Sequence, residues 1–294
     1  MPRNLIFRPL ECRPDTYREW FRQANQLREW EQYDAALYSY ERALEYYPDD
    51  FWAWYRRGKV LERLHRYEEA SASFDNAILV NPKNYWAWYD RGRLAFRQNK
   101  FLSAITCFQQ AAKVELNDYW CFYRQGEAWR HLSDYDNALA AYSRALEARP
   151  HDYWARYRQG DIQQIAGHFE AALVSYKKAL VAKPGDFWCQ FQRAAIYERL
   201  NYLDAAIEGF QEIARKHPDA DRIWYHLAVC YRLQKKPDLV IEMLSRAIAI
   251  SPRKYEELLP CDPEFASFSD DLRFKALLAK AHQDGAVRPA TPNH

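Results

Sequence analysis

One aromatic motif recurs along the chain at an unvarying interval of 34 residues. It reads FWAWYRRG from Phe51, YWAWYDRG from Tyr85, YWCFYRQG from Tyr119 and YWARYRQG from Tyr153, and a fifth copy starts at Phe187. A fixed period in the thirties indicates supersecondary units stacked in tandem, because one such unit cannot bury its apolar face alone. The sequence therefore predicts one long solenoid, although 294 residues would otherwise suggest about two globular domains.

The period also sets the expected boundaries. We number the positions of each repeat from the first residue of the motif, so that Phe51 and Tyr85 occupy position 1. A lead-in without periodicity covers 1–16, a closing segment 255–284, and a polar, proline-containing tail that we expect to be disordered 285–294. The seven predicted repeats are 17–50, 51–84, 85–118, 119–152, 153–186, 187–220 and 221–254.

Each repeat contains two amphipathic segments separated by a short break. The second segment ends at a proline in six repeats, and proline cannot continue a helix. Two helices of this length joined by tight turns form an antiparallel pair, so we predict an all-α fold. The terminal prolines are Pro48, Pro82, Pro150, Pro184, Pro218 and Pro252.

Small residues explain how the two helices approach each other. Glycine occupies position 8 at Gly58, Gly92, Gly126 and Gly160. A glycine inside a helix costs roughly 1 kcal/mol relative to alanine, so we expect a compensating close contact with the second helix. That second helix presents an aromatic side chain between two alanines, as a knob that fits such a hole.

The pattern resembles the tetratricopeptide repeat family over residues 17–254. The marks are the early aromatics such as Trp54 and Trp88, the position-8 glycines, the alanines of the second helix and the terminal proline. The resemblance implies a right-handed superhelical α-solenoid. Position 7 departs from the family, since Arg or Gln replaces the usual Leu, and this variant looks like arrays common in photosynthetic bacteria. The closing segment is similar to the last helix of such arrays, with Ser269 or Asp270 as its cap and Leu272, Phe274, Leu277 and Leu278 over the open end of the stack.

The face of the first helix that carries positions 2, 5, 6, 9, 12 and 13 is expected to be free. The opposite face holds the packing glycine, and the family resemblance also implies that the free face lines a concave groove. Tryptophan recurs there at position 2 and an aromatic ring at position 5, with basic side chains between them. The predicted ligand-binding residues are Trp52, Trp86, Trp120, Trp154, Trp188, Tyr55, Tyr89, Tyr123, Tyr157, Phe191, Lys59, Arg93, Arg97, Arg124, Arg130 and Arg158.

Two interpretations of this ladder stand side by side. The rings can pack on one another and on arginine stems and so stiffen the solenoid. Alternatively the ladder is a binding surface, because Trp, Tyr and Arg are the residues enriched at binding hot spots. Five half-exposed tryptophans would exceed the few hundred Å² of apolar patch usual on a monomer.

Three function classes follow. The first is a protein-interaction scaffold or adaptor that holds a partner peptide or protein segment in the aromatic and basic groove, as the family resemblance implies. The Lys and Asn clamp with which some family members grip a terminal carboxylate is absent, because Phe21 takes the place of the Lys and only Asn25 remains. The alternative is single-stranded nucleic-acid binding by stacking beside Arg, which the net charge of only +2 disfavours.

The third class, an enzyme, lacks support. The sequence contains no phosphate-binding glycine loop, zinc-protease motif or nucleophile elbow, so we predict no catalysis, no cofactor and no metal site. Cys121, Cys189 and Cys230 occupy small apolar slots and are expected to be reduced and structural. With no signal peptide and no apolar run of membrane-spanning length, we predict a cytoplasmic monomer or weak homo-oligomer.

Overall fold

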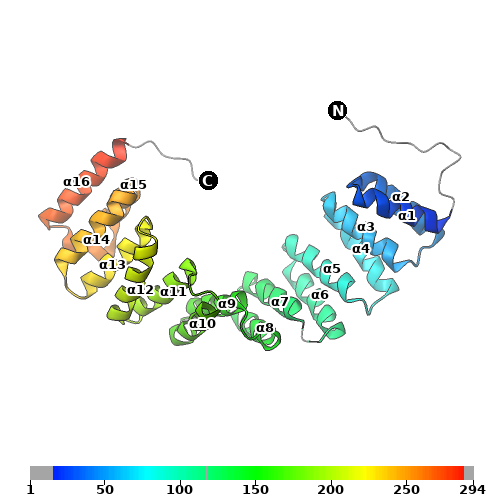
Figure 1. Cartoon of the computed structure of the whole chain (residues 1–294), viewed down its shortest axis with the longest axis horizontal. Coiled ribbons are helices and arrows are strands. Elements are labelled where there is room, and N and C mark those ends of the chain that lie inside the picture. Colours follow the sequence, from blue (N-terminus) through cyan, green and yellow to red (C-terminus); the bar gives the residue numbers. More distant parts are fainter. Residues whose placement is uncertain (1–15, 117, 288–294) are drawn as a thin grey trace. The chain divides into compact units, whose positions relative to one another are not determined.

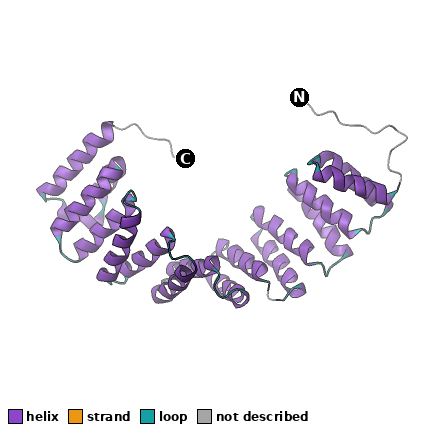
Figure 2. Cartoon of the chain, in the orientation of Figure 1, coloured by secondary structure: helices purple, strands orange, loops and turns teal. Residues whose placement is uncertain are grey.

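The computed structural model describes residues 16–116 and 118–287. Within these ranges the chain consists of helices and the loops that join them (Figures 1 and 2). It divides into two compact units, Met1–Pro150 and His151–His294, which we describe separately. Helices pair in sequence order, and we call the first member of each pair helix A and the second helix B.

Unit 1 is a tandem stack of four antiparallel pairs. Each helix A begins at position 1 of its repeat and each helix B at position 17. The pairs are α1 (Tyr17–Glu29) with α2 (Tyr33–Tyr46), α3 (Phe51–Arg63) with α4 (Tyr67–Val80), α5 (Tyr85–Arg97) with α6 (Phe101–Val114), and α7 (Tyr119–His131) with α8 (Tyr135–Ala148).

Unit 2 continues the same pattern with three pairs and then a different ending. The pairs are α9 (Tyr153–Ile165) with α10 (Phe169–Ala182), α11 (Phe187–Arg199) with α12 (Leu203–Lys216), and α13 (Asp221–Leu233) with α14 (Pro237–Ile250). The ending consists of α15 (Pro252–Leu258), the 3₁₀ turns η2 (Leu259–Cys261) and η3 (Pro263–Phe268), and α16 (Leu272–Val287). All-α architecture and paired helices in tandem are therefore confirmed.

The same local devices begin and end the helices in successive repeats. A carboxylate or amide oxygen just before helix A accepts the backbone N–H three residues later, at 2.5–3.1 Å, and so caps the helix. These caps are Asp50, Asn84, Asp118, Asp152 and Asp186. At position 15, between helices A and B, the backbone is left-handed in all seven repeats, with φ of 58–60° for the non-glycine residues and 79° for Gly167.

The position-8 glycines lie directly against the large ring of helix B, as the sequence predicts. A Cβ added to Gly126 would stand 2.7 Å from Cε1 of Tyr142, and one added to Gly58 would stand 2.9 Å from Cε1 of Phe74. Both rings are fully buried. The close approach of the two helices is the gain that keeps glycine inside helix A.

The ending of unit 2 packs on the last repeat. Tyr255, Phe265 and Phe274 join Leu244 and Ile248 in one buried cluster, with Leu277 and Leu278 packed against it. Burial of these apolar side chains stabilises the end of the stack.

Two details of the predicted closing helix are wrong. Leu272 is 80% exposed, because it is the first residue of α16 and faces away from the cluster. The carboxylate that accepts an N–H at the start of the helix belongs to Asp271, which accepts from Arg273 at 2.8 Å, rather than to Ser269 or Asp270.

The predicted ends of the chain fall largely outside the described residues. This holds for 1–15 of the lead-in and for 288–294 of the tail, whereas α16 runs as far as Val287. None of the described helices combines the length and the apolar character needed to cross a membrane.

Candidate functional site

The five position-2 tryptophans are all half exposed. Their exposed fractions are 49% for Trp52, 56% for Trp86, 45% for Trp120, 50% for Trp154 and 52% for Trp188. The first three belong to α3, α5 and α7 of unit 1, and the other two to α9 and α11 of unit 2. The side chains at positions 2, 5, 6, 9, 12 and 13 of the helices A in unit 1 are called the unit 1 face. Those at the same positions of the helices A in unit 2 are called the unit 2 face.

Neighbouring side chains hold these indoles in place. Each one meets the position-1 ring of its own helix edge to face, with centroids 5.0–5.1 Å apart. A cation also lies over four of the five rings, at 4.8–5.8 Å from the centroid: Arg56 over Trp52, Arg149 over Trp120, Lys183 over Trp154 and Arg222 over Trp188. Within the described chain, Trp86 has no cation over its ring.

The position-5 rings connect the face to the core of each repeat. Tyr55 stacks on Phe51 and packs against Phe74 of helix B, with centroids 5.8 Å apart in both pairs. Tyr89, Tyr123, Tyr157 and Phe191 contact the corresponding rings of helix B in the same way. The sequence analysis expected these rings to lie on the binding surface beside the tryptophans. In the structure, most of their surface instead contacts other rings of the same repeat.

Hydroxyl groups at position 5 also link repeats. Tyr55 donates to Oδ2 of Asp90 in the next helix A, at 2.6 Å. Burial, and then the adjacent carboxylate, raise the pKa of the Tyr55 phenol well above its ordinary value. Burial likewise raises the pKa of Tyr157 to about 12. These tyrosines are therefore neutral hydrogen-bond donors at physiological pH.

Three predicted basic residues of unit 1 share two carboxylates. Glu62 accepts from Arg93 at 2.6 Å and from Arg97 at 2.9 Å. Asp90 binds Lys59 at 3.3 Å and Arg93 at 3.1 Å. The two acids are 7% and 5% exposed, so the carboxylates lie beneath the cations that they hold.

The other predicted basic residues are also engaged. Arg130 pairs with Glu127 at 3.0 Å, and Arg158 pairs with Asp161 at 3.1 Å. The charge of Arg124 lies near the hydroxyl of Tyr89, where it opposes the rise in pKa that burial causes. The predicted cations are thus held by neighbouring side chains, and that they bind a ligand stays a prediction. Sequence analysis missed that the acids on the same face are buried, a result of contacts between repeats that no single repeat reveals.

Two further recurring links lie between repeats. Position-4 tryptophans donate their indole N–H to the carbonyl of the preceding terminal proline, Trp54 to Pro48 at 2.7 Å and Trp88 to Pro82 at 2.8 Å. The position-1 hydroxyl of Tyr85 donates to Asp118, the cap of the next helix A, at 2.8 Å. The sequence held a signal for the second link, because position 1 is Phe in the two helices, α3 and α11, whose following helix A lacks an Asp cap. The residue before that following helix is Asn84 in the first case and Ala220 in the second.

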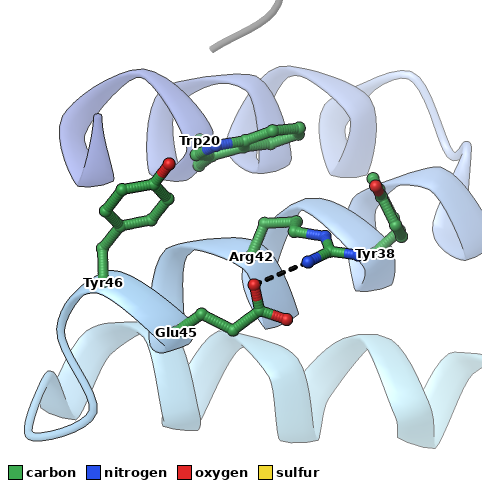
Figure 3. Close-up of a pocket in the computed structure, with 5 residues that line it drawn as sticks. All are labelled: Trp20, Tyr38, Arg42, Glu45 and Tyr46. Carbon is green, nitrogen blue, oxygen red and sulfur yellow. Dashed lines mark hydrogen bonds and ion pairs between the residues drawn. The ribbon is translucent and has the colours of Figure 1, made fainter. Parts of the chain in front are cut away.

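An aromatic cleft of ≈ 330 Å³ lies outside both faces, between α1 and α2 (Figure 3). Trp20 forms one wall, Tyr38 and Tyr46 the other, and Arg42 pairs with Glu45 between them at 2.6 Å. Elsewhere in the described ranges, no group of three or more His, Cys, Asp or Glu side chains has the arrangement of a metal site.

Comparison with known proteins agrees with this geometry. Models described as tetratricopeptide repeat match residues 55–119, 89–153, 123–187 and 187–230, and a further TPR repeat model matches 24–65. No curated protein matches the chain in sequence.

Solved structures share the fold at low sequence identity. The C-terminal part of a TPR repeat-containing protein from Cytophaga hutchinsonii is 16% identical, with a TM-score of 0.68, over 79% of this chain and 95% of that one. MamA from Desulfovibrio magneticus is 16% identical, with a TM-score of 0.53, and the match covers 59% of this chain and 98% of MamA. YrrB, described as a TPR protein with an unusual peptide-binding site, is 20% identical, with a TM-score of 0.54, over 67% and 97%. The matched repeats cover most of the chain, which therefore belongs to the tetratricopeptide repeat family.

Proposed function

We propose that the chain is a non-catalytic interaction scaffold whose helix A faces bind a peptide or an extended segment of a partner protein. The observation that carries this proposal is the half-exposed tryptophan at position 2 in five consecutive repeats. Leaving so much indole surface in water is unfavourable, and a large exposed apolar patch typically marks an interaction site. The family assignment supports a scaffold in general, and the described peptide site of YrrB shows that the fold accommodates peptides.

The pre-positioned tryptophans favour binding over a purely structural role. Edge contacts fix each indole, and cations lie over four of the five, while about half of the indole surface stays accessible. A side chain ordered before binding loses little rotamer entropy when a partner arrives. We place the protein in a reducing compartment such as the cytoplasm, which the five free cysteines among the described residues support.

The test combines peptide selection with a matched pair of variants. Peptides selected from a random display library on the full chain are titrated against Trp52→Ala/Trp86→Ala/Trp120→Ala. We expect affinity to fall at least about 30-fold, because an aromatic anchor is often worth about 2 kcal/mol or more. A second variant removes Trp154 and Trp188 in unit 2.

The control variant replaces three equally exposed aromatic side chains that lie off the faces, Trp30, Tyr38 and Tyr46, by Ala. It should bind the selected peptides like the wild type. If the face variant instead unfolds at much lower urea concentration while its folded fraction binds normally, the tryptophans are structural struts and the proposal is wrong.

A further inference from the structure

We infer that the unit 1 face takes a partner segment rich in Asp and Glu. This inference rests on the proposed function and names the chemistry of its partner. Ten side chains of the unit 1 face are Lys or Arg and four are Asp or Glu, whereas the unit 2 face has four and two. The whole chain carries a net charge of only +2, so the excess of basic groups is a property of the unit 1 face and not of the chain as a whole.

Burial of the acids makes the outer layer of this face more basic than the count alone suggests. Glu62, Asp90 and Glu127 are 5–8% exposed. The cations that hold them stand above, with Lys59 35% and Arg97 44% exposed. An approaching ligand therefore meets ammonium and guanidinium groups first, and the summed charge attracts acidic ligands.

Three arginines of the face remain available for a partner. Arg18, Arg22 and Arg63 are exposed, and no carboxylate pairs with them in the part of the chain that the structure describes. Arg18 occupies in α1 the position that Trp52 occupies in α3. The two helices are adjacent, since Arg56 of α3 hydrogen-bonds Asn25 and lies over the ring of Phe21 in α1. The free guanidinium groups of Arg18 and Arg22 therefore lie on the helix next to the one that carries Trp52, and that of Arg63 lies at the far end of α3.

The state of the rings favours an acidic peptide over single-stranded nucleic acid. Bases need open ring faces on which to stack. On unit 1, Arg56 lies over the ring of Trp52 and Arg149 over that of Trp120, and the position-5 rings are packed toward the core. Among the described residues of this face, that leaves Trp86 as the tryptophan without a cation over its ring, fewer open rings than a run of stacked bases would need. Carboxylates need only the N–H edges of Lys and Arg, in charge-assisted hydrogen bonds. The accessible indole edges suit the apolar side chains between the acids.

The experiment uses the full chain and three fluorescein-labelled probes. One is a short peptide that alternates Glu pairs with Leu and Phe, the second has Lys in place of Glu, and the third is oligothymidylate. Fluorescence anisotropy measures binding to the wild type and to Arg18→Glu/Arg22→Glu/Arg63→Glu. A control, Lys113→Glu/Lys177→Glu/Lys178→Glu, changes the net charge equally at exposed helix B positions.

We expect the acidic peptide to bind the wild type and the control alike, and the face variant at least about tenfold more weakly. Binding should also weaken with added salt. Circular dichroism verifies folding, and Arg→Gln replacements at the same positions serve if charge reversal unfolds the protein. Equal weakening in both variants, equal binding of the Lys peptide, or tighter binding of oligothymidylate would overturn the inference.

The two proposals fail separately. Library-selected peptides that depend on Trp52, Trp86 and Trp120 but tolerate the Arg→Glu changes would leave the scaffold function in place and refute the acidic partner. Selected peptides that tolerate both sets of changes would refute both.

Discussion

Replacing Gly126 by Ala tests the packing that brings helices A and B together. An added Cβ would lie 2.7, 2.8 and 2.9 Å from three ring atoms of Tyr142. The ring has no room to retreat, because it is fully buried and its hydroxyl donates to Oε1 of Glu127 at 2.5 Å. Overpacking of this kind costs about 1–3 kcal/mol.

A second effect opposes the first. Alanine is favoured over glycine in a helix by roughly 1 kcal/mol. With three contacts under 3.0 Å we place the steric cost in the upper part of its range, so the expected net loss of unfolding free energy is about 1–2 kcal/mol. Urea denaturation followed by far-UV circular dichroism measures it.

A double-mutant cycle separates the two effects. In a Tyr142→Leu background the ring is gone, so Gly126→Ala should stabilise the protein by its helix propensity alone, about 1 kcal/mol. Stabilisation by Gly126→Ala in the wild-type background, or an equal loss in both backgrounds, would refute the close-contact reasoning.

Three further outcomes are expected. Gly167→Ala should cost about 1–2 kcal/mol, since its Cβ meets nothing within 4 Å and only the left-handed backbone opposes it, whereas Gly185→Ala, equally open but without positive φ, should cost nothing in the same urea titration. Trp54→Phe should lower stability by about 0.5–1.5 kcal/mol through loss of the 2.7 Å bond to the proline carbonyl, and an unchanged melting curve would show the bond to be dispensable. Burial raises the pKa of the Cys107 thiol to about 11, which leaves almost no reactive thiolate at pH 8. Peptide mapping after iodoacetamide treatment of the native protein should therefore find the exposed Cys261 modified and Cys107 intact. Rapid labelling of Cys107 in the native protein would contradict its burial.

Features that depend on one repeat were predictable from sequence. The paired helices of each repeat and the glycine–aromatic contact follow from local patterns that recur every 34 residues, and each copy reinforces the others. The Asp and Asn caps of helices A are local as well, but they were not among the predictions. Half exposure of the tryptophans also followed from the helical periodicity.

Features that depend on contacts between repeats were not predictable. Helical periodicity puts Glu62 and Asp90 on the same face as Trp52, but their burial arises from cations of neighbouring helices, including the Glu62–Arg97 pair 35 residues apart. The cap at Asp271 and the exposure of Leu272 were also missed, because the closing segment occurs once and no repeat fixes its register. That these faces bind a partner remains a prediction.

The hydrogen bond from Tyr85 to Asp118 has a consequence for cooperativity. The acceptor is the residue that caps the following helix A, so a folded repeat helps to nucleate its neighbour, and nucleation is the costly step of helix formation. Burial, and then the caps Asp50 and Asp186, raise the pKa values of Tyr17 and Tyr153, so these phenols lie beside the caps of the next helices A in a similar way. The link is missing where position 1 is phenylalanine, which has no hydroxyl to donate. Phe51 stands in the repeat before the Asn84 cap, and Phe187 stands in the repeat before Ala220, which has no capping side chain. In a chain of nearest-neighbour couplings, these two junctions should be the places where native-state hydrogen exchange shows one block of repeats opening before the next.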